Sequence, residues 1–222
     1  MDFRTEDQDG MCNALQVRWT ATPKIAPQPW ITCSGCGGLR AFQSSNKIRL
    51  NANGRKLDAW LIYKCVTCDK TWNRPILERQ SVRDVDPAML EALQSNDPDW
   101  IRAETFNLDA LRRKSRRIDE SAELDVHKQV LRDIADWDHL EIELSVPFPV
   151  STRLDRLLAS GLNISRTRLN LLHESALLRT TPDHADILRR RIRSGIRIMV
   201  DLSGLPDREL VWKPRAAGHA SG

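Results

Sequence analysis

The chain has 222 residues, a net charge of +4, 41% apolar residues and 29% charged residues. This composition is ordinary for a soluble globular protein and excludes a chain that is disordered throughout. No stretch approaches the roughly 20 consecutive apolar residues of a membrane span, and the acidic N-terminus is unlike the basic and then apolar start of a secretion signal. We therefore expect a cytoplasmic protein without a membrane partner, long enough for one large or two small domains.

The positive charge is concentrated near the C-terminus. Residues 151–202 contain 10 arginines and 5 acidic residues, whereas residues 1–150 contain 21 basic and 23 acidic residues. A basic segment next to a nearly neutral one predicts a partner that carries negative charge.

The first predicted elements are strands. Residues 15–22 contain Val17, Trp19 and several threonines and stop at Pro23, which is typical of a short strand. Asn53-Gly54 suits the two central positions of a type I′ hairpin turn. A two-residue loop predicts these opposite pairs: Ala52 with Arg55, Leu50 with Leu57, Ile48 with Ala59, and Arg49 with Asp58. An apolar row then lies on one face of the hairpin and an ion pair on the other.

Four of the five cysteines form two Cys-x-x-Cys pairs, separated by 28 residues. Thiols stay reduced in the cytosol, so paired cysteines there more often bind a metal than form a disulfide. Zinc accepts four thiolates in a tetrahedron, and the predicted hairpin returns the second pair to the first. The sequence therefore predicts a zinc ribbon with one structural Zn²⁺ ion, bound by Cys33, Cys36, Cys65 and Cys68.

Such a site has no open coordination position, so it would stabilise the fold and would not catalyse a reaction. Gly37 and Gly38 would let the backbone turn tightly after the first pair, and Trp60 and Trp72 are expected to cover the site. The alternative is a disulfide or a set of unreactive thiols. Cys12 is left over, and a small buried or unreactive thiol is its simplest interpretation.

The middle of the chain has a helical pattern from residue 84 to about residue 128. Asp86, Asp97 and Asn107 each stand where a helix start is expected. The basic run at residues 112–117 is interpreted as a solvated helix end, with a nucleic-acid contact as the alternative. Residues 140–146 alternate in polarity and predict a half-buried strand, followed by a boundary at Pro147 and Pro149.

The C-terminal segment predicts two helices and a strand. Residues 152–159 place leucines on one helical face and stop at Gly161. Ser165 is placed to cap a second helix, from Arg166 to about Ala176, whose inner stripe includes Leu169. Residues 195–202 alternate like a strand after a turn.

This series resembles the small RNA-binding domain named after the fourth protein of the ribosomal small subunit, the S-four domain. The likeness rests on Arg153-Leu154-Asp155, on Ser165-Arg166 and on the closing turn that precedes Ile196. In that family the exposed face of the two helices binds structured RNA through basic side chains. By position, the resemblance implies RNA contacts from Arg153, Arg156, Arg166, Arg168, His173 and Arg193.

The chain departs from the S-four pattern after the second helix. Where the family has a short strand, this chain has residues 176–182 and then an arginine-rich segment, residues 188–193. A helical bundle whose arginines face water is the alternative for this region.

The chain as a whole is also similar to a family of uncharacterised bacterial proteins, domain of unknown function 1062. The similarity rests on the first cysteine pair, on residues 48–65 and on Thr71-Trp72-Asn73. It implies no activity. The five histidines share no recognisable catalytic pattern with a serine, a cysteine or a carboxylate, and no phosphate-binding or nucleophile-elbow motif is present.

The sequence therefore predicts an α+β protein of four parts. These are an N-terminal zinc-ribbon module (13–80), a helical connector with a strand (84–146), an S-four-like α/β RNA-binding domain (151–202) and a flexible tail (203–222). The expected function is that of a zinc-stabilised protein that binds structured RNA or the ribosome. A protein–protein adaptor or regulatory protein with a structural zinc, and an unrecognised enzyme, are the alternatives.

Overall fold

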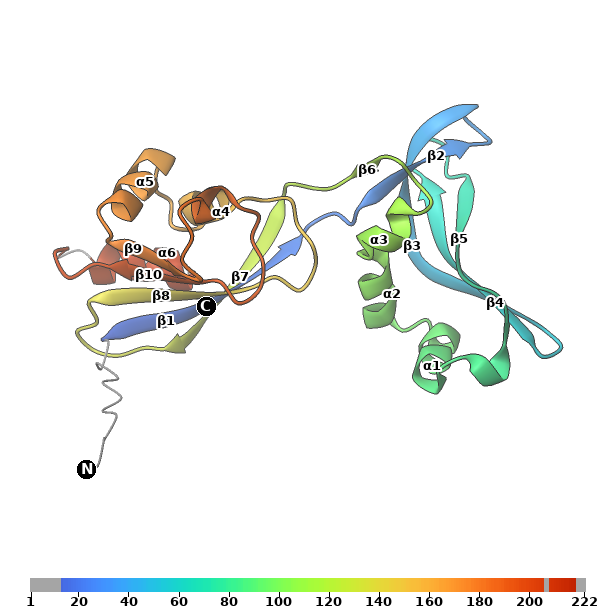
Figure 1. The fold of residues 1–222 in the computed structure, drawn as a ribbon, viewed down its shortest axis with the longest axis horizontal. Helices are drawn as coiled ribbons and strands as arrows, with labels where there is room; N and C mark the ends of the chain where they lie inside the picture. Colours follow the sequence, from blue (N-terminus) through green and yellow to red (C-terminus); the bar gives the residue numbers. More distant parts are fainter. Residues whose placement is uncertain (1–12, 206–207, 219–222) are drawn as a thin grey trace, which may run out of the picture. The chain divides into compact units, whose positions relative to one another are not determined.

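The structure, a computed structural model, describes residues 13–205 and 208–218, and Cys12 lies outside these ranges. The described residues form a mixed α+β fold with two five-stranded sheets and six α-helices (Figure 1). The chain divides into two compact units. Unit 1 combines the chain up to Thr22 with the chain from Leu124 onward, and unit 2 is Pro23–Glu123. Among the described residues, no helix is long and apolar enough to cross a membrane.

Unit 1 contains a five-stranded mixed sheet of order β7-β1-β8-β10-β9. Its strands are β1 (Ala14–Pro23), β7 (Leu124–Arg132), β8 (His139–Ser145), β9 (Leu178–Thr181) and β10 (Arg197–Asp201). β1 is parallel to β8, whereas β10 is antiparallel to both β8 and β9. The strands predicted near residues 15–22, 140–146 and 195–202 are confirmed. β7 lies in part of the segment that was expected to be helical.

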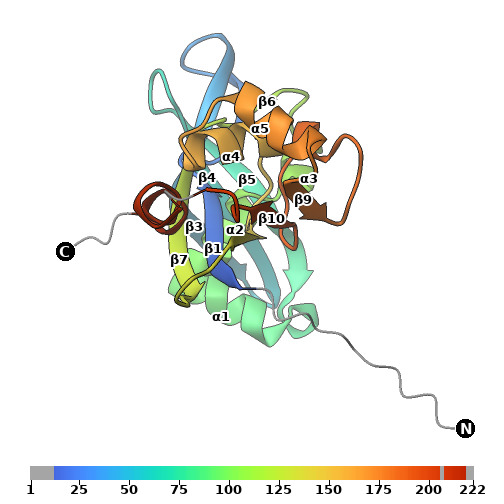
Figure 2. The ribbon, with the colours of Figure 1, turned by 90° about the vertical axis from the view of Figure 1, so that its left-hand side faces the viewer.

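Helices cover one face of this sheet (Figures 1 and 2). They are α4 (Leu154–Gly161) and α5 (Arg166–Glu174), which contact each other. A short 3₁₀ turn, η2 (Ile187–Arg189), packs against α4. Alternate side chains of β1 are fully buried, among them Leu15, Val17 and Trp19. The opposite face is polar, and Arg18 pairs there with Glu143 at 3.1 Å. Alternating polarity along the strands therefore decides which face the helices cover.

The end of the chain also belongs to the core of unit 1. A π-helical turn, η3 (Arg208–Trp212), runs into α6 (Lys213–Ala217). Trp212 and Ala216 are buried, and the Trp19 indole donates a hydrogen bond to the Ala216 carbonyl at 2.8 Å. The expected flexible tail at 203–222 is therefore wrong for residues 208–218. The two buried residues are four positions apart, so they share one helical face and pack together.

Unit 2 contains a second five-stranded sheet, of order β5-β4-β3-β2-β6. Its strands are β2 (Gln28–Cys33), β3 (Gly38–Asn53), β4 (Lys56–Cys65), β5 (Thr71–Ser81) and β6 (Ile118–Asp119). All four neighbouring pairs are antiparallel. Its core includes Phe42, Leu61 and Tyr63.

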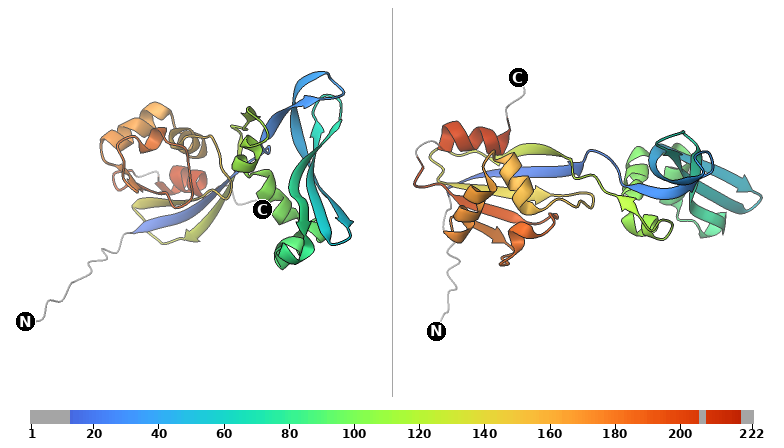
Figure 3. Two further views of the ribbon diagram at one scale, coloured as in Figure 1. Left: turned by 45° about the vertical axis from the view of Figure 1, so that its right-hand side comes forward. Right: turned by 90° about the horizontal axis from the view of Figure 1, so that it is seen from above.

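Three helices pack against this sheet (Figure 3). They are α1 (Pro87–Ser95), α2 (Pro98–Thr105) and α3 (Leu108–Arg112), preceded by the 3₁₀ turn η1 (Val82–Asp84). Each predicted helix start is confirmed, because each capping side chain accepts a backbone N–H of the first turn. The three bonds run from Met89 to Asp86 at 2.9 Å, from Trp100 to Asp97 at 2.7 Å and from Ala110 to Asn107 at 3.0 Å.

The predicted hairpin is present, but its predicted register is wrong. Asn53 pairs with Lys56 and Ala52 with Leu57, so the loop is Gly54-Arg55. Gly54 has a φ of 60°, whereas Arg55 is not among the residues with positive φ. A turn with glycine at its first central position is type II′, whereas the predicted Asn53-Gly54 loop would be type I′. Each residue therefore faces a partner two positions further along β4.

A shift of two residues keeps every side chain on its predicted face. The apolar row survives, with Leu50 now opposite Ala59. The expected pairing of Arg49 with Asp58 does not form. Arg49 instead lies opposite Trp60, with its guanidinium carbon 5.8 Å from the ring centroid.

The two units do not follow the expected segments 13–80, 84–146 and 151–202. β1, which was expected in the zinc-ribbon module, belongs to the sheet of unit 1, and the expected connector is divided at Glu123. Parallel strands need a long connection between them, and here that connection contains all of unit 2. No local pattern in β1 reveals a partner more than a hundred residues away.

Candidate metal centre and candidate nucleic-acid interface

The four paired cysteines meet at one end of the unit 2 sheet. Cys33 ends β2 and Cys65 ends β4, while Cys36 and Cys68 lie in the turns that lead into β3 and β5. The hairpin of β3 and β4 brings the two turns together, and its register places Phe42 opposite Cys65.

The sulfur atoms are as close as one metal ion requires. All four lie within 4.8 Å of one another. Two of the distances are 3.4 Å, between Cys33 and Cys68, and 3.9 Å, between Cys36 and Cys65. Thiolates bound to a tetrahedral ion at about 2.3 Å lie about 3.8 Å apart. The donor set therefore fits a single metal ion.

The surrounding chain leaves room for this arrangement. Cys33 and Cys65 are buried, Cys36 is half-buried and Cys68 is exposed. A side chain at Gly35 would place its Cβ 3.0 Å from the Cys68 sulfur. A methyl group at this position would also lie 2.7 Å from the Lys70 Cγ atom, so glycine relieves crowding against the opposite turn.

The close packing of the thiols shifts their pKa values in opposite directions. Contact with Cys68, followed by burial, raises the pKa of Cys36 to about 12. Burial alone would raise the pKa of Cys65, but hydrogen bonds from the backbone of Thr67 and Cys68 outweigh burial and lower that pKa to about 6. Four thiolates this close repel one another, and a bound cation removes that repulsion. The donor set can hold a metal ion in a closed, four-sulfur site.

Only one of the two tryptophans expected to cover the site lies near it. The Trp72 ring packs 5.2 Å from Tyr63 and 6.3 Å from Phe42, measured between ring centroids. Trp60 is an odd number of residues from Cys65 on the same strand, so the two side chains point to opposite faces.

Three of the six residues implied as RNA contacts line one hollow in unit 1. Arg153, Arg166 and His173 surround a space of about 400 Å³. Arg153 is the N-cap residue of α4, and Arg166 is the first residue of α5. Ser165 caps α5 as predicted, because its hydroxyl accepts the backbone N–H of Arg168 at 3.1 Å.

The other three residues do not line this hollow. Arg156, Arg168 and Arg193 are exposed. Arg168 lies over the buried ring of Trp212, with 5.8 Å between its guanidinium carbon and the ring centroid. Its side chain is therefore turned toward the C-terminal segment.

A fourth basic residue in the hollow, Arg189, was not predicted. Backbone bonds hold its segment beside the start of α4, from Leu154 N to Arg190 O and from Ile192 N to Thr152 O, both at 3.0 Å. The arginine run at residues 188–193 was visible in the sequence, but its position opposite α4 was not.

The hollow also contains three carboxylates. Asp155 is largely buried, accepts a hydrogen bond from Arg153 at 2.7 Å and accepts the backbone N–H of Arg156 at 2.8 Å. Glu174 and Asp186 line the same space. The hollow is therefore a mixed-charge site, in which Asp155 holds the Arg153 side chain in place.

One comparison with known proteins identifies a family. The family model described as "Protein of unknown function (DUF1062)" matches residues 50–184. No curated protein and no solved structure matches the chain.

The matched region runs from the β3–β4 hairpin of unit 2 to His184 in unit 1. It includes the second cysteine pair and the helices α4 and α5. It covers more than half of the 222 residues. The chain therefore belongs to the DUF1062 family.

Proposed function

We propose that this is a zinc-stabilised protein that binds structured RNA through the arginine-lined hollow of unit 1. Zinc is proposed for the cysteine site because four thiolates with no oxygen or nitrogen ligand favour Zn²⁺ over harder cations. The ion would stabilise the two turns of unit 2 that carry the cysteines. With all four positions filled by sulfur, it would not take part in a reaction.

The observation that carries the RNA proposal is the meeting of Arg153, Arg166 and Arg189 around one hollow. These residues come from three separate places in the chain, and their guanidinium groups suit phosphate oxygens. The resemblance of residues 151–202 to an S-four domain, which is drawn from the sequence, adds the expectation that this part of the chain binds structured RNA. The hollow would follow the shape of a folded RNA, since side chains cannot reach base edges in the deep A-form groove.

Salt dependence tests this proposal. We expect the affinity of the protein for a structured RNA to fall steeply as salt rises, because each phosphate contact releases a counterion. An Arg153→Ala, Arg166→Ala double variant should reduce the salt slope by about one unit for each arginine that binds a phosphate. Arg132→Ala is the matched control, because Arg132 is an exposed arginine on β7, at the opposite edge of the sheet from β9.

The acidic residues provide a test in the opposite direction. Glu174→Gln and Asp186→Asn each remove a negative charge from the hollow and should strengthen RNA binding. Binding that is unchanged in the double arginine variant, or an effect of Arg132→Ala of the same size, would overturn the proposal. Absence of binding to structured RNA at low salt would also overturn it.

A second candidate, a protein–protein adaptor, is favoured by the cysteine turns. Leu39 is 58% exposed directly after the first turn, and Val66 is 49% exposed within the second. Exposed apolar side chains, where they form a continuous patch, mark protein contacts. If Leu39→Ser abolishes the protein's cellular role while RNA binding persists, the adaptor is the better description.

A further inference from the structure

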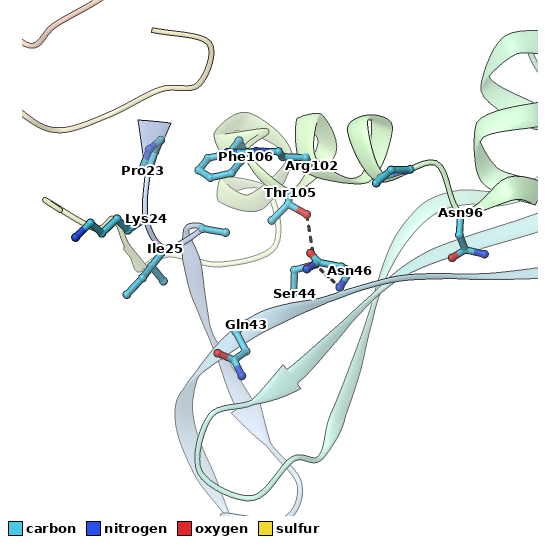
Figure 4. A pocket seen from close by; sticks show the side chains of 12 residues that line it. Pro23, Lys24, Ile25, Gln43, Ser44, Asn46, Asn96, Arg102, Thr105 and Phe106 are labelled. Carbon is cyan, nitrogen blue, oxygen red and sulfur yellow. Dashed lines mark hydrogen bonds between the residues drawn. The ribbon is translucent and has the colours of Figure 1, made fainter. Parts of the chain in front are cut away.

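Unit 2 contains a second hollow, of about 510 Å³, between α2, the middle of β3 and residues 23–26. This volume lies in the range of small-molecule sites. Figure 4 shows its walls and one end: Arg102, Thr105 and Phe106 from the end of α2, Ser44 and Asn46 from β3, and Lys24 and Ile25. The proposed function does not involve these residues.

An irregular stretch of β3 forms one wall. β3 leaves its register with β4 between Ser44 and Ile48. Asn46, within this bulge, has a φ of 56°, and Asn96, which ends α1, has a φ of 54°. The Asn96 side chain accepts the backbone N–H of Ile48 at 2.7 Å. Bulges often lie beside binding sites because they redirect side chains, and this one turns Ser44 toward α2.

The opposite wall is held firmly. Arg74, which is 1% exposed, donates to the Glu104 carboxylate and, at 3.1 Å, to the Glu104 carbonyl. Separating the pair would leave the buried Arg74 charge without its partner, which is costly, so this ion pair fixes the end of α2. Next to it, Thr105 donates to the Ser44 hydroxyl at 3.3 Å. The walls are therefore preformed, which reduces the ordering that a ligand must cause.

A backbone bond also anchors the end of the hollow, from Lys24 N to Glu123 O at 3.0 Å.

The charged side chains that line the hollow are all positive. Lys24 and Arg102 carry positive charge, and among the described residues no aspartate or glutamate lines this hollow.

The uncharged residues of the lining suit a flat ligand that has hydrogen-bonding groups at its edge. Gln43, Asn46 and Asn96 carry amides that both donate and accept hydrogen bonds, and Phe106 and Ile25 supply apolar surface. Cations select phosphate, amides read the edge of a heterocyclic base, and apolar side chains contact its plane.

Figure 4 shows the exposed Lys24 side chain extending away from Arg102 and Ser44, so its ammonium must turn inward to reach a ligand. We propose that this hollow binds a single nucleotide, with Arg102 and the inward-turned Lys24 at the phosphate and the asparagine and glutamine amides at the base. The same chemistry is offered by a free nucleotide and by an unpaired nucleotide of an RNA strand. The site lies in unit 2 and does not depend on the arginine-lined hollow of unit 1.

The test is a titration of the full chain with 5′-AMP, 5′-UMP, the matching nucleosides, inorganic phosphate and a short single-stranded RNA. We expect a nucleotide to bind at least tenfold more tightly than its nucleoside or than phosphate, since both halves of the site contribute. Lys24→Gln and Arg102→Gln should each weaken nucleotide binding about tenfold. Lys24 is exposed, so its variant tests the site even if Arg102→Gln fails to fold.

Arg83→Gln is the matched control, because Arg83 is an exposed arginine of unit 2 outside the hollow. Single-stranded RNA that binds more tightly than the free nucleotide would identify a strand as the source, and equal binding would identify the free nucleotide. Both outcomes support the site. Phosphate that binds as well as a nucleotide, no nucleotide binding, or an equal effect of Arg83→Gln would overturn it. The Arg153→Ala, Arg166→Ala variant should bind nucleotides normally, which separates this inference from the proposed function.

Discussion

Gly37 and Asp69 occupy equivalent positions in the two cysteine turns. Each follows the first cysteine of its pair by four residues and donates its backbone N–H to that cysteine's carbonyl, at 2.9 Å to Cys33 and 3.0 Å to Cys65. Both have left-handed backbones, with φ of 70° and 59°. The two turns therefore share one backbone conformation, although glycine closes the first and aspartate the second.

This equivalence predicts opposite effects at the two positions. Gly37→Ala should destabilise unit 2 by about 1–2 kcal/mol, because alanine is strained in a left-handed backbone. Within the described part of the chain, a Cβ at Gly37 would meet no atom within 4 Å, so the cost is conformational. Asp69→Gly should leave stability unchanged or raise it, by at most about 1 kcal/mol. Thermal unfolding of the metal-loaded protein measures both, and equal shifts in the same direction would contradict the expectation.

The cysteine site should hold one zinc per chain by elemental analysis. Cys65→Ser, or removal of the metal by a chelator, should unfold unit 2, because ligation energy is folding energy in such sites. Unit 1 should stay folded, since its core contains no residue of the cysteine turns. Hydrogen exchange followed along the whole chain separates the two responses.

Cys12→Ser is the control for this experiment and should retain the metal. A stable metal-free protein whose four paired thiols react freely would show that the site is not structural.

Gly161 should tolerate no side chain. A Cβ there would overlap the ring of Trp19, which is fully buried in unit 1. Lys128 locks the same region, because its ammonium donates to the Gly161 carbonyl at 2.7 Å and to the Arg215 carbonyl. We expect Gly161→Ala to destabilise unit 1 by about 1–3 kcal/mol, the usual cost of overpacking.

The matched control is Gly204→Ala, because a Cβ at Gly204 would meet no atom of the described residues within 4 Å and its φ is not in the left-handed range. This variant should be neutral or slightly stabilising. Urea unfolding compares the two variants, and equal stability would show that the Trp19 ring can move aside.

Tyr63 is the single tyrosine of the chain, so its ionisation can be followed alone. Burial raises the pKa of Tyr63 to about 12, although the positive charge of Arg74 acts in the opposite direction. Its phenolate absorbance in the folded protein should therefore rise near pH 12. In denaturant it should rise near the ordinary value of about 10.

The ionisation of Tyr63 makes the free energy of unfolding depend on pH. Between about pH 10 and 12 the folded state binds more protons at Tyr63 than the unfolded state, so the free energy of unfolding falls as pH rises. Below about pH 10 the contribution is fully present. Tyr63→Phe should make this fall smaller, because it removes the Tyr63 contribution and leaves that of the lysines. Ionisation of Tyr63 near pH 10 in the folded protein would contradict the burial of the hydroxyl.

Local signals in the sequence were sufficient for several features. The helix starts at Asp86, Asp97, Asn107 and Ser165 depend on a side chain and a backbone N–H only three residues apart. The gathering of the four paired cysteines was also predicted, because an antiparallel hairpin must return to its origin. The Asn53-Gly54 signal located that hairpin but missed its register. The predicted type I′ turn needs positive φ at both Asn53 and Gly54, and of these two residues only Gly54 has it.

Other features depend on contacts between distant residues, so only the tertiary structure decided them. The sheet of unit 1 joins β1 to β8, Trp212 and Ala216 pack into its core, and Arg189 reaches the start of α4 across more than thirty residues of chain. The hollow beside Thr105 likewise requires α2 to lie over a bulge of β3. A capping bond or a hairpin turn is determined within a few residues, whereas these contacts form only when apolar faces of separate elements are buried together. The sequence by itself therefore determined the cysteine cluster and the helix starts, and the burial of distant elements decided how the basic side chains are grouped.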